Sequence, residues 1–382
     1  MCEGFDVQAA GVAAAGLSHA FQPSPGALGL FFSASGAGLF LGALVGGRLA
    51  DHIGHRAVLI ASIAAFGLFS ILTSYGWDIR SLTGARLLTG LGLGGAMPNL
   101  IALVDSLGGS GSRNRRIGLT YIGMPLGGAV ASVLALVLPG EEWRLIFRVG
   151  GFAPLLILPF MLRWLPEDRR TGDGESGERP GIGQLLFGGG RAARTGVLWL
   201  GFFLAVLTLH LMINWLPLLL LGRGLSRTGA SIAQLGFNAG GGGMALVVGA
   251  LLDSRWRRIC IAGTVASLPA VLLLLARSPV QPALLMLLSC LLGGAILGQQ
   301  VIAFSVAGSY VPPEGRGTAV GSAVASGRLG SLAGPLFAAS LLAGGRSSAQ
   351  VLLALLPIAL LCGACIGLLA WSRLQARAPR PA

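Results

Sequence analysis

Four ionisable side chains interrupt apolar stretches of the sequence. Glu3 and Asp6 are acidic residues near the start, and Arg86 and Arg328 each lie deep inside a long apolar run. The planar guanidinium of an arginine can donate two parallel hydrogen bonds to one carboxylate, which suits it to binding carboxylic acids. An acidic side chain in apolar surroundings can take up a proton and so lose its charge. This set of residues predicts the binding of an organic anion together with the transfer of a proton.

The composition places these residues inside a membrane. The chain has 382 residues, of which 54% are hydrophobic and 11% are charged, and its mean hydropathy is +0.78. In an ordinary soluble domain, about a quarter of the residues are charged. These values exclude a soluble enzyme, a disordered chain and a disulfide scaffold, and they leave a protein that crosses the bilayer many times. At about 20 residues per transmembrane helix, the chain has room for roughly a dozen spans.

Two series of six apolar runs are expected to form the transmembrane helices. The first series runs from the start to Phe21, then over Ala27–Leu49, Ala57–Trp77, Ile79–Val104, a fifth run ending near Leu138, and Trp143–Leu165. The second series covers Thr195–Leu221, Ala230–Leu252, Arg258–Ala276, Pro282–Val311, Thr318–Ala343 and Gln350–Ser372. The expected fold class is therefore an all-α membrane protein built from two six-helix bundles.

The composition changes between the two series. Residues 166–194 are rich in Gly, Glu, Asp and Arg, and they cannot bury enough apolar surface to fold alone. We therefore expect an N-terminal six-helix bundle over residues 1–165, a cytoplasmic linker over 166–194, a C-terminal six-helix bundle over 195–372 and a cytoplasmic tail over 373–382.

The placement of arginine predicts the orientation in the membrane. The formal net charge is +13, and every cationic residue other than histidine is an arginine. If the first helix starts in the cytoplasm, the cytoplasmic loops and ends hold roughly three times as many arginines as the other side, as expected for bacterial inner-membrane proteins. Both termini are therefore expected to be cytoplasmic. The arginines form short clusters between apolar runs, so they do not predict a nucleic-acid partner.

A short motif occurs once in each half, at the end of the second helix. Its residues are Gly47, Asp51 and Arg56 in the first half, and Gly249, Asp253 and Arg258 in the second. The first copy, Gly47-Arg-Leu-Ala-Asp51-His-Ile-Gly54-His-Arg56, resembles the loop motif of the major facilitator superfamily, in which a parallel repeat of two six-helix halves forms a transporter. Asp51 can cap a helix or pair with an arginine of a neighbouring helix, and such a pair can close a gate in one state only.

Further segments resemble one family within that superfamily, the aromatic acid:proton symporters, and within it the hydroxyphenylpropionate transporters. They are Glu3-Gly-Phe-Asp6, the run from Arg86 to Asn99, Asn214-Trp-Leu-Pro217, Arg316-Gly-Thr, and the run from Gly327-Arg328 to Gly334-Pro335. The resemblance covers nearly the whole chain. Because the acidic motif lies at residues 3–6, the first helix is expected to lack its cytoplasmic half.

The resemblance implies proton-coupled uptake of a small aromatic carboxylate, hydroxyphenylpropionate-like or hydroxybenzoate-like, by alternating access. Arg86 and Arg328, one in each half, are expected to flank a central cavity and bind the carboxylate, with Asp6 and Glu3 carrying the proton. Other polar residues within spans could orient the substrate: Tyr121, His210, Asn214, Gln299 and Gln300. Gating is assigned to the residues of the repeated motif and to one further arginine: Gly47, Asp51, Gly54, Arg56, Asp253, Arg258 and Arg316.

Several alternatives stay open at this point. Each arginine within a span could form an ion pair between helices, and each polar residue there could join two helices. The chain could be a drug or metabolite:proton antiporter, although its fifth helix reads Gly123-Met-Pro125-Leu-Gly127-Gly128 rather than the antiporter pattern. An enzyme is not expected, because the spans hold no Ser/His/Asp set or cluster of metal ligands. Asp51-His52-x-x-His55 could bind a metal, but an ordinary site needs three or four ligands, so neither metal nor cofactor is expected.

Overall fold

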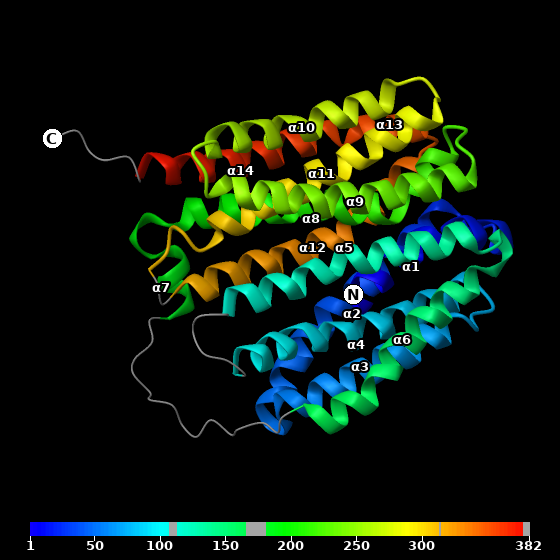
Figure 1. The fold of residues 1–382 in the computed structure, drawn as a ribbon, viewed down its shortest axis with the longest axis horizontal. Coiled ribbons are helices and arrows are strands. Elements are labelled where there is room, and N and C mark those ends of the chain that lie inside the picture. Colours follow the sequence, from blue (N-terminus) through cyan, green and yellow to red (C-terminus); the bar gives the residue numbers. More distant parts are fainter. Residues whose placement is uncertain (107–112, 166–180, 313–314, 377–382) are drawn as a thin grey trace.

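The computed structural model is a bundle of long helices that run in nearly one direction (Figure 1). It describes residues 1–106, 113–165, 181–312 and 315–376. Within these ranges, the backbone alone is described for residues 51, 97, 98, 101–106, 113–122 and 373–376. The described residues form helices and connecting loops without a β-strand. The expected all-α membrane fold is therefore confirmed.

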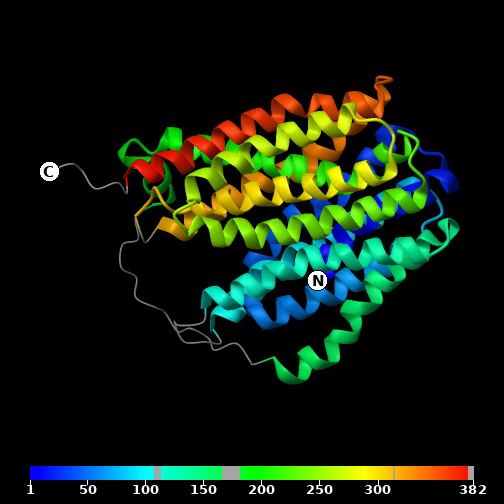
Figure 2. The same cartoon turned by 45° about the horizontal axis from the view of Figure 1, so that its top comes forward.

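The helices of the first half follow the apolar runs closely. They are α1 (Cys2–Phe21), α2 (Pro25–Ile53), α3 (His55–Thr73), α4 (Ile79–Ser106), α5 (Arg113–Val137) and α6 (Trp143–Trp164), with a short 3-10 turn, η1 (Gly140–Glu142), before α6. The start of α1 lies within the bundle, where Figures 1 and 2 mark the N-terminus.

The second half adds two short elements to the six expected helices. Its elements are α7 (Ile182–Phe187), η2 (Gly188–Gly190), α8 (Ala192–Leu221), α9 (Arg227–Leu252), α10 (Arg257–Arg277), α11 (Pro282–Ala307), α12 (Arg316–Ala343), α13 (Ser348–Ala354) and α14 (Leu356–Ala376). The run expected as one last helix is divided at Leu355. Pro357 explains the break, because it has no amide hydrogen to donate and its ring clashes with the preceding helical turn.

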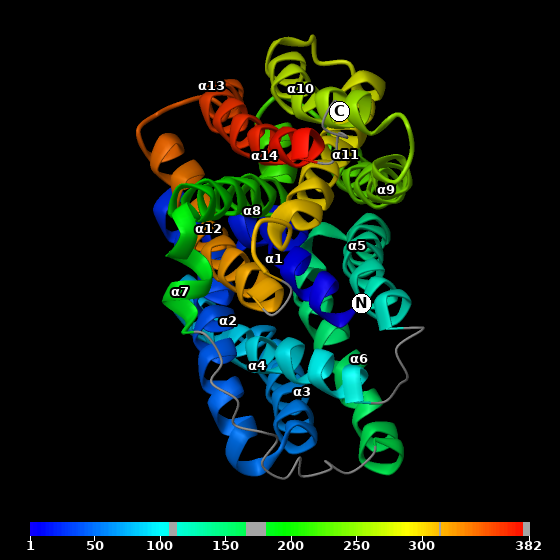
Figure 3. The ribbon, with the colours of Figure 1, turned by 90° about the vertical axis from the view of Figure 1, so that its left-hand side faces the viewer.

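Helix packing repeats between the halves. In the first half α4 packs against α2 and α3, α6 against α3, and α1 against α5. In the second half α11 packs against α9 and α10, α14 against α10, and α8 against α12. The halves meet where α2 contacts α12 and where α5 contacts α9, two contacts that the same repeat relates, and where α1 contacts α8. Viewed along the bundle, the two groups lie on either side of this interface (Figure 3).

The bundle has two ends, which are the two expected membrane surfaces. We call the end where α6 stops at Trp164 and α8 starts at Ala192 the linker face, which is on the left in Figure 1, and the end where α1 meets α2 the opposite face. Part of the expected linker is folded at the linker face. Leu185 and Leu186 of α7 are buried against the second half, and the Thr195 hydroxyl donates to the Leu186 carbonyl at 2.6 Å.

Most of the long helices have the length and the hydropathy of a transmembrane span. Eight of the described helices are long and apolar enough to cross a bilayer. Helices α1, α4 and α12 are of similar length but fall outside that set, and they are the helices that carry Asp6, Arg86 and Arg328. A charged residue inside a span is costly and is kept where it has a role. The protein is an integral membrane protein, and Asp6, Arg86 and Arg328 lie in three long helices of lower hydropathy.

Glycine lets α2 and α4 approach closely. A Cβ atom at Gly38 would lie 2.0 Å from the Leu87 carbonyl oxygen, and one at Gly90 would lie 2.0 Å from the Ser35 carbonyl oxygen. Helices in a membrane associate through such small residues because backbones can then contact one another directly. This contact fixes α4, and so Arg86, against the rest of the first half.

Replacing Gly90 with alanine is therefore expected to destabilise the fold. The new methyl group must push α2 away from α4, and overpacking of this kind costs about 1–3 kcal/mol. A drop in the thermal unfolding midpoint of the detergent-purified protein measures this loss. Gly84→Ala is the matched control on the same helix, because a Cβ there meets nothing within 4 Å. Equal midpoints for the two variants would contradict the close contact.

Candidate functional site

Asp6 and Arg86 form a buried ion pair inside the first half. The Nη1 atom of Arg86 on α4 lies 2.6 Å from Oδ1 of Asp6 on α1, and its Nη2 donates to the Asp6 main-chain oxygen at 3.1 Å. The two side chains are 1% and 0% exposed, and the guanidinium lies over the Phe147 ring at 5.8 Å. Among the described residues, Asp6 Oδ2 and Arg86 Nε have no hydrogen-bond partner. One face of the carboxylate is thus left available for a proton.

The loop before α4 places Arg86. Asp78 caps the helix, and its Oδ1 accepts the Ser81 amide at 2.7 Å, which lowers the pKa of the Asp78 carboxyl and keeps it ionised. Arg144 of α6 donates to the carbonyl oxygens of Ser74 and Gly76 at 3.1 and 3.2 Å. The start of α4 is therefore tied to both its own loop and α6.

Glu3 and Arg328 face each other across the two halves. Nη2 of Arg328 on α12 lies 3.9 Å from Oε1 of Glu3 on α1, which is the outer limit of an ion pair. The side chains are 25% and 13% exposed. A long, partly exposed pair is weak compared with the short buried pair of Asp6 and Arg86. Arg328 is therefore the arginine that can exchange its acidic partner for another carboxylate.

The structure separates the two arginines that were expected to share one anion. Arg86 is enclosed in the first half with Asp6, whereas Arg328 lies at the interface between the halves. The sequence placed each arginine inside an apolar run but did not give the direction in which its side chain points. In this conformation, the alternative of an ion pair between helices describes Arg86.

Two of the expected substrate residues, His210 and Asn214, lie on α8, which packs against α12, the helix that carries Arg328. The ring of His210 interacts electrostatically with Arg328. Its Nδ1 lies 3.1 Å from the Val206 carbonyl oxygen. Asn214 is buried one turn further, where its amide donates to the His210 carbonyl at 2.8 Å. The Nε2 of Gln300 on α11 is buried without a partner among the described residues.

The remaining two expected residues differ from this group. Gln299 is buried within the second half, where its Nε2 lies 3.4 Å from the carbonyl oxygens of Thr264 and Val265 and its Oε1 lies 3.5 Å from the Cys362 sulfur. A side chain engaged there does not face Arg328, so we leave Gln299 out of the binding set. The side chain of Tyr121 lies outside the described residues.

A buried polar network joins the halves next to these pairs. The Gln8 side chain on α1 bonds to Asn238 on α9, its Oε1 accepts from Gln234 at 2.9 Å, and Asn238 also donates to the Ser132 hydroxyl on α5 at 3.3 Å. Gln8 was not singled out in the sequence analysis. The available signal was an amide side chain two positions after Asp6 in an apolar run.

Polar and aromatic contacts between the halves gather toward the opposite face. Ser33 of α2 donates to the Leu332 carbonyl of α12 at 2.9 Å, and the Phe32 ring meets the Trp215 ring of α8 edge-on at 5.1 Å. Between Arg328 and the start of α12 at the linker face, no described residue of α12 makes a further polar or aromatic contact to the first half. The bundle is therefore closed at the opposite face, with Arg328 at the inner end of that closure.

Comparison with known proteins places this architecture in a family. The sequence pattern of the Major Facilitator Superfamily matches residues 1–335. The chain belongs to this superfamily. The fold agrees: a bacterial homologue of the human lysosomal transporter Spinster, solved in an inward-facing, unoccupied conformation, superimposes with a TM-score of 0.80 at 16% identity over 100% of this chain and 96% of the other. A D-xylose–proton symporter superimposes with a TM-score of 0.73 at 16% identity over 100% of this chain and 95% of the other.

Relatives within the Major Facilitator Superfamily are closer in sequence. A 3-(3-hydroxy-phenyl)propionate transporter of Escherichia coli is 39% identical over 97% of this chain and 91% of its own length. A 4-hydroxybenzoate transporter of Pseudomonas aeruginosa is 31% identical over 94% of this chain and 87% of its own length. A gallate transporter of Pseudomonas putida is 30% identical over 89% of this chain and 82% of its own length. The expected resemblance to aromatic acid transporters is confirmed.

The superfamily loop motif lies at the linker face. Gly54 ends α2 and starts α3 with φ 91°, a conformation that suits glycine because it has no Cβ. Arg56 donates to the Leu162 carbonyl of α6 at 2.7 Å, and His55 Nδ1 lies 2.7 Å from Asn99 Oδ1 on α4. These contacts tie α3 to α6 and α4, while the Asp51 side chain lies outside the described residues.

The second copy of the motif makes different contacts from the first. Asp253 is the residue at which α9 ends, and Arg258 lies over the Trp371 ring of α14 at 5.9 Å, on the flank of the second half. Arg316 starts α12 and lines a cavity within that half. Among the described residues, neither arginine has a hydrogen bond or ion pair to the first half, so a gating role would require another state of the bundle.

Proposed function

We propose that the protein is a secondary active transporter that takes up a small aromatic carboxylate together with a proton by alternating access. The observation that carries this proposal is Arg328, a cationic side chain inside a span and at the interface of the two halves, whose one ion pair with a described residue is the 3.9 Å contact to Glu3. Such a group can bind an anion without first breaking a strong bond.

The substrate class follows from the chemistry of Arg328 and from the relatives. A guanidinium selects a carboxylate over a neutral group through paired, charge-assisted hydrogen bonds. The relatives named above are transporters of hydroxyphenylpropionate, hydroxybenzoate and gallate, which are all aromatic acids. We assign the orientation of the substrate to three polar side chains of the second half, His210 and Asn214 on α8 and Gln300 on α11.

Competition between the Glu3 carboxylate and the substrate carboxylate for Arg328 would couple substrate binding to proton binding. While Glu3 is ionised, it occupies the guanidinium that the substrate needs. Protonation of Glu3 removes its charge and releases Arg328, so the proton and the substrate anion enter the site together. The substrate then takes the place of the Glu3 carboxylate, and the net charge of the site stays the same as the halves move.

Asp6 is the second proposed proton carrier. Its Oδ2 has no partner among the described residues, and a proton there would weaken the bond to Arg86. Because this pair joins α1 to α4, its weakening would let α1 shift within the first half. Two-state elements of this kind convert a local change of charge into movement of a bundle.

We place the protein in the cytoplasmic membrane of a bacterium, with the linker face and both termini in the cytoplasm. The support is the excess of arginine at that face. In this orientation the closed opposite face is the outer one. Residues 1–165 and 195–372 would then be the two bundles that rock against each other, with residues 166–194 as the cytoplasmic linker between them.

Uptake into proteoliposomes tests the proposal. With an inward proton gradient of one pH unit, labelled 3-(3-hydroxyphenyl)propionate is expected to accumulate up to about tenfold above its external concentration, because one proton that moves with one monoanion carries no net charge and one pH unit corresponds to a factor of ten. A proton ionophore should abolish the accumulation. Uptake unaffected by the ionophore would contradict symport, and efflux of a cationic drug driven by the same gradient would instead favour the antiporter.

A further inference from the structure

Tryptophan side chains mark the membrane surface at the linker face of the second half. Trp256 and Trp371 are both exposed, and the guanidinium groups of Arg255 and Arg258 lie over their rings at 5.3 and 5.9 Å. Tryptophan and arginine gather at the level of the lipid headgroups because one part of each side chain is apolar and the other is polar. Residues beside Trp371 are therefore at headgroup depth.

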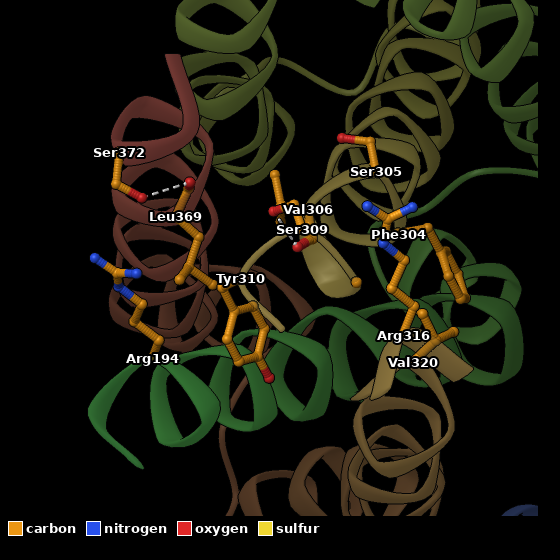
Figure 4. Close-up of a pocket in the computed structure, with 11 residues that line it drawn as sticks. Arg194, Phe304, Ser305, Val306, Ser309, Tyr310, Arg316, Val320, Leu369 and Ser372 are labelled. Atoms are coloured by element: carbon orange, nitrogen blue, oxygen red, sulfur yellow. Dashed lines mark hydrogen bonds between the residues drawn. The ribbon is translucent and has the colours of Figure 1, made fainter. Parts of the chain in front are cut away.

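A cavity of about 530 Å³ lies at this depth between α8, α11, α12 and α14. We call it the basic cavity, because Arg194 and Arg316 both line it, and Figure 4 shows them on either side of Tyr310. Neither guanidinium has a hydrogen bond or ion pair with another described residue, and no acidic residue is among those that line the cavity. The basic cavity therefore holds two positive charges without a counter-charge from the described part of the chain.

An apolar groove adjoins the basic cavity at Ser372 of α14. The groove, also about 530 Å³, lies between α10 and α14 and is lined by Ile261, Ala262, Val265, Gly367, Leu368, Trp371 and Ser372. Ser372 also lines the basic cavity, so the two spaces share this residue. From Trp371 the groove extends toward Val265 and Gly367, which lie deeper in the membrane by one to two helical turns.

We infer that the basic cavity binds the phosphate group of an anionic phospholipid, with an acyl chain in the apolar groove. Arg194 and Arg316 supply charge and hydrogen-bond donors for a phosphate, and the groove offers an apolar surface at the depth where a chain leaves its headgroup. A free phosphate ester would use the basic cavity alone, so the adjoining groove favours the lipid. This site is separate from Arg328 and does not depend on the transport proposal.

Native mass spectrometry of the purified full-length protein tests the inference. After equilibration with equal amounts of phosphatidylglycerol and phosphatidylcholine, the unaltered protein is expected to retain phosphatidylglycerol at least tenfold over phosphatidylcholine. The Arg194→Gln, Arg316→Gln double variant should lose that preference, because each arginine near the surface contributes about a fivefold gain for an anionic lipid. Arg346→Gln, which changes an exposed arginine at the opposite face, is the matched control and should keep the preference.

A second variant tests the groove. A Cβ atom at Gly367 would lie 4.0 Å from Val265 Cγ2, an ordinary contact, so a leucine side chain built from this position would extend into the groove. Gly367→Leu should weaken phosphatidylglycerol retention while leaving the thermal unfolding midpoint unchanged. If the double arginine variant retains the lipid as well as the control does, the site is wrong. If glycerol 1-phosphate displaces the lipid at equal concentration, or if Gly367→Leu has no effect, the occupant is a free phosphate ester and the lipid inference is overturned.

Discussion

Replacing Arg328 with glutamine is expected to lower the initial rate of 3-(3-hydroxyphenyl)propionate uptake by about 100-fold or more. The substrate carboxylate would lose its cationic partner, and truncating one partner of a hydrogen-bonded charge pair at an interface costs about 2–5 kcal/mol. Each 1.4 kcal/mol corresponds to a factor of ten in binding. Uptake at substrate concentrations below saturation, measured in proteoliposomes at equal protein density, gives this ratio.

A second arginine within a span controls for general damage. Arg148 on α6 donates to the Ser74 hydroxyl at 3.3 Å and lies over the Tyr75 ring, away from the interface between the halves. Arg148→Gln should therefore reduce uptake by less than about tenfold, even if it slightly lowers stability. Arg328→Gln and Arg148→Gln with similar uptake would mean that Arg328 does not bind the substrate.

Replacing Asp6 with asparagine is expected to have two separate effects. The first is on stability: Arg86 would remain buried without an anionic partner, at a cost of about 3–5 kcal/mol in the free energy of unfolding. The second is on coupling: asparagine cannot release a proton, so the variant should exchange substrate across the membrane but fail to accumulate it against a gradient. Thermal unfolding measures the first effect, and counterflow compared with proton-driven uptake measures the second.

A double variant separates these effects. Adding Arg86→Gln to Asp6→Asn removes the buried unpaired charge, so most of the lost stability should return, as expected for residues in direct contact. Accumulation should stay absent, because the carboxylate is still missing. A double variant no more stable than Asp6→Asn would contradict the ion pair. Gradient-driven accumulation by either variant would show that Asp6 is not a proton carrier.

Much of the architecture could be predicted because membrane insertion constrains the sequence strongly. The apolar runs predicted the ends of the long helices in the described chain to within a few residues. The positions of Arg86 and Arg328 inside such runs marked them as unusual residues. The cost of a charge in the bilayer is what makes this reasoning work. Even so, the break at Leu355 was missed, although Pro357 was visible in the sequence as its cause.

The partners of these side chains could not be predicted, because partner choice depends on helix rotation and on packing between distant helices. Asp6 and Glu3 lie three residues apart, yet one faces Arg86 within the first half and the other faces Arg328 in the second. Gln299 and Gln300 are adjacent, and the backbone turns about 100° between them, so only one of them is engaged with α10. A helix boundary can be predicted from composition alone, but these directions require the tertiary structure.

The most direct test of the account compares the affinity of two ligands for two proteins. The ligands are 3-(3-hydroxyphenyl)propionate and its uncharged carboxamide, and the proteins are the unaltered chain and Arg328→Gln, with dissociation constants measured by isothermal titration calorimetry in detergent. If Arg328 holds the carboxylate, the unaltered protein should prefer the acid over the amide by about 100-fold, and the variant should bind both with nearly equal affinity. A variant that still prefers the acid by the same factor would show that another group recognises the carboxylate.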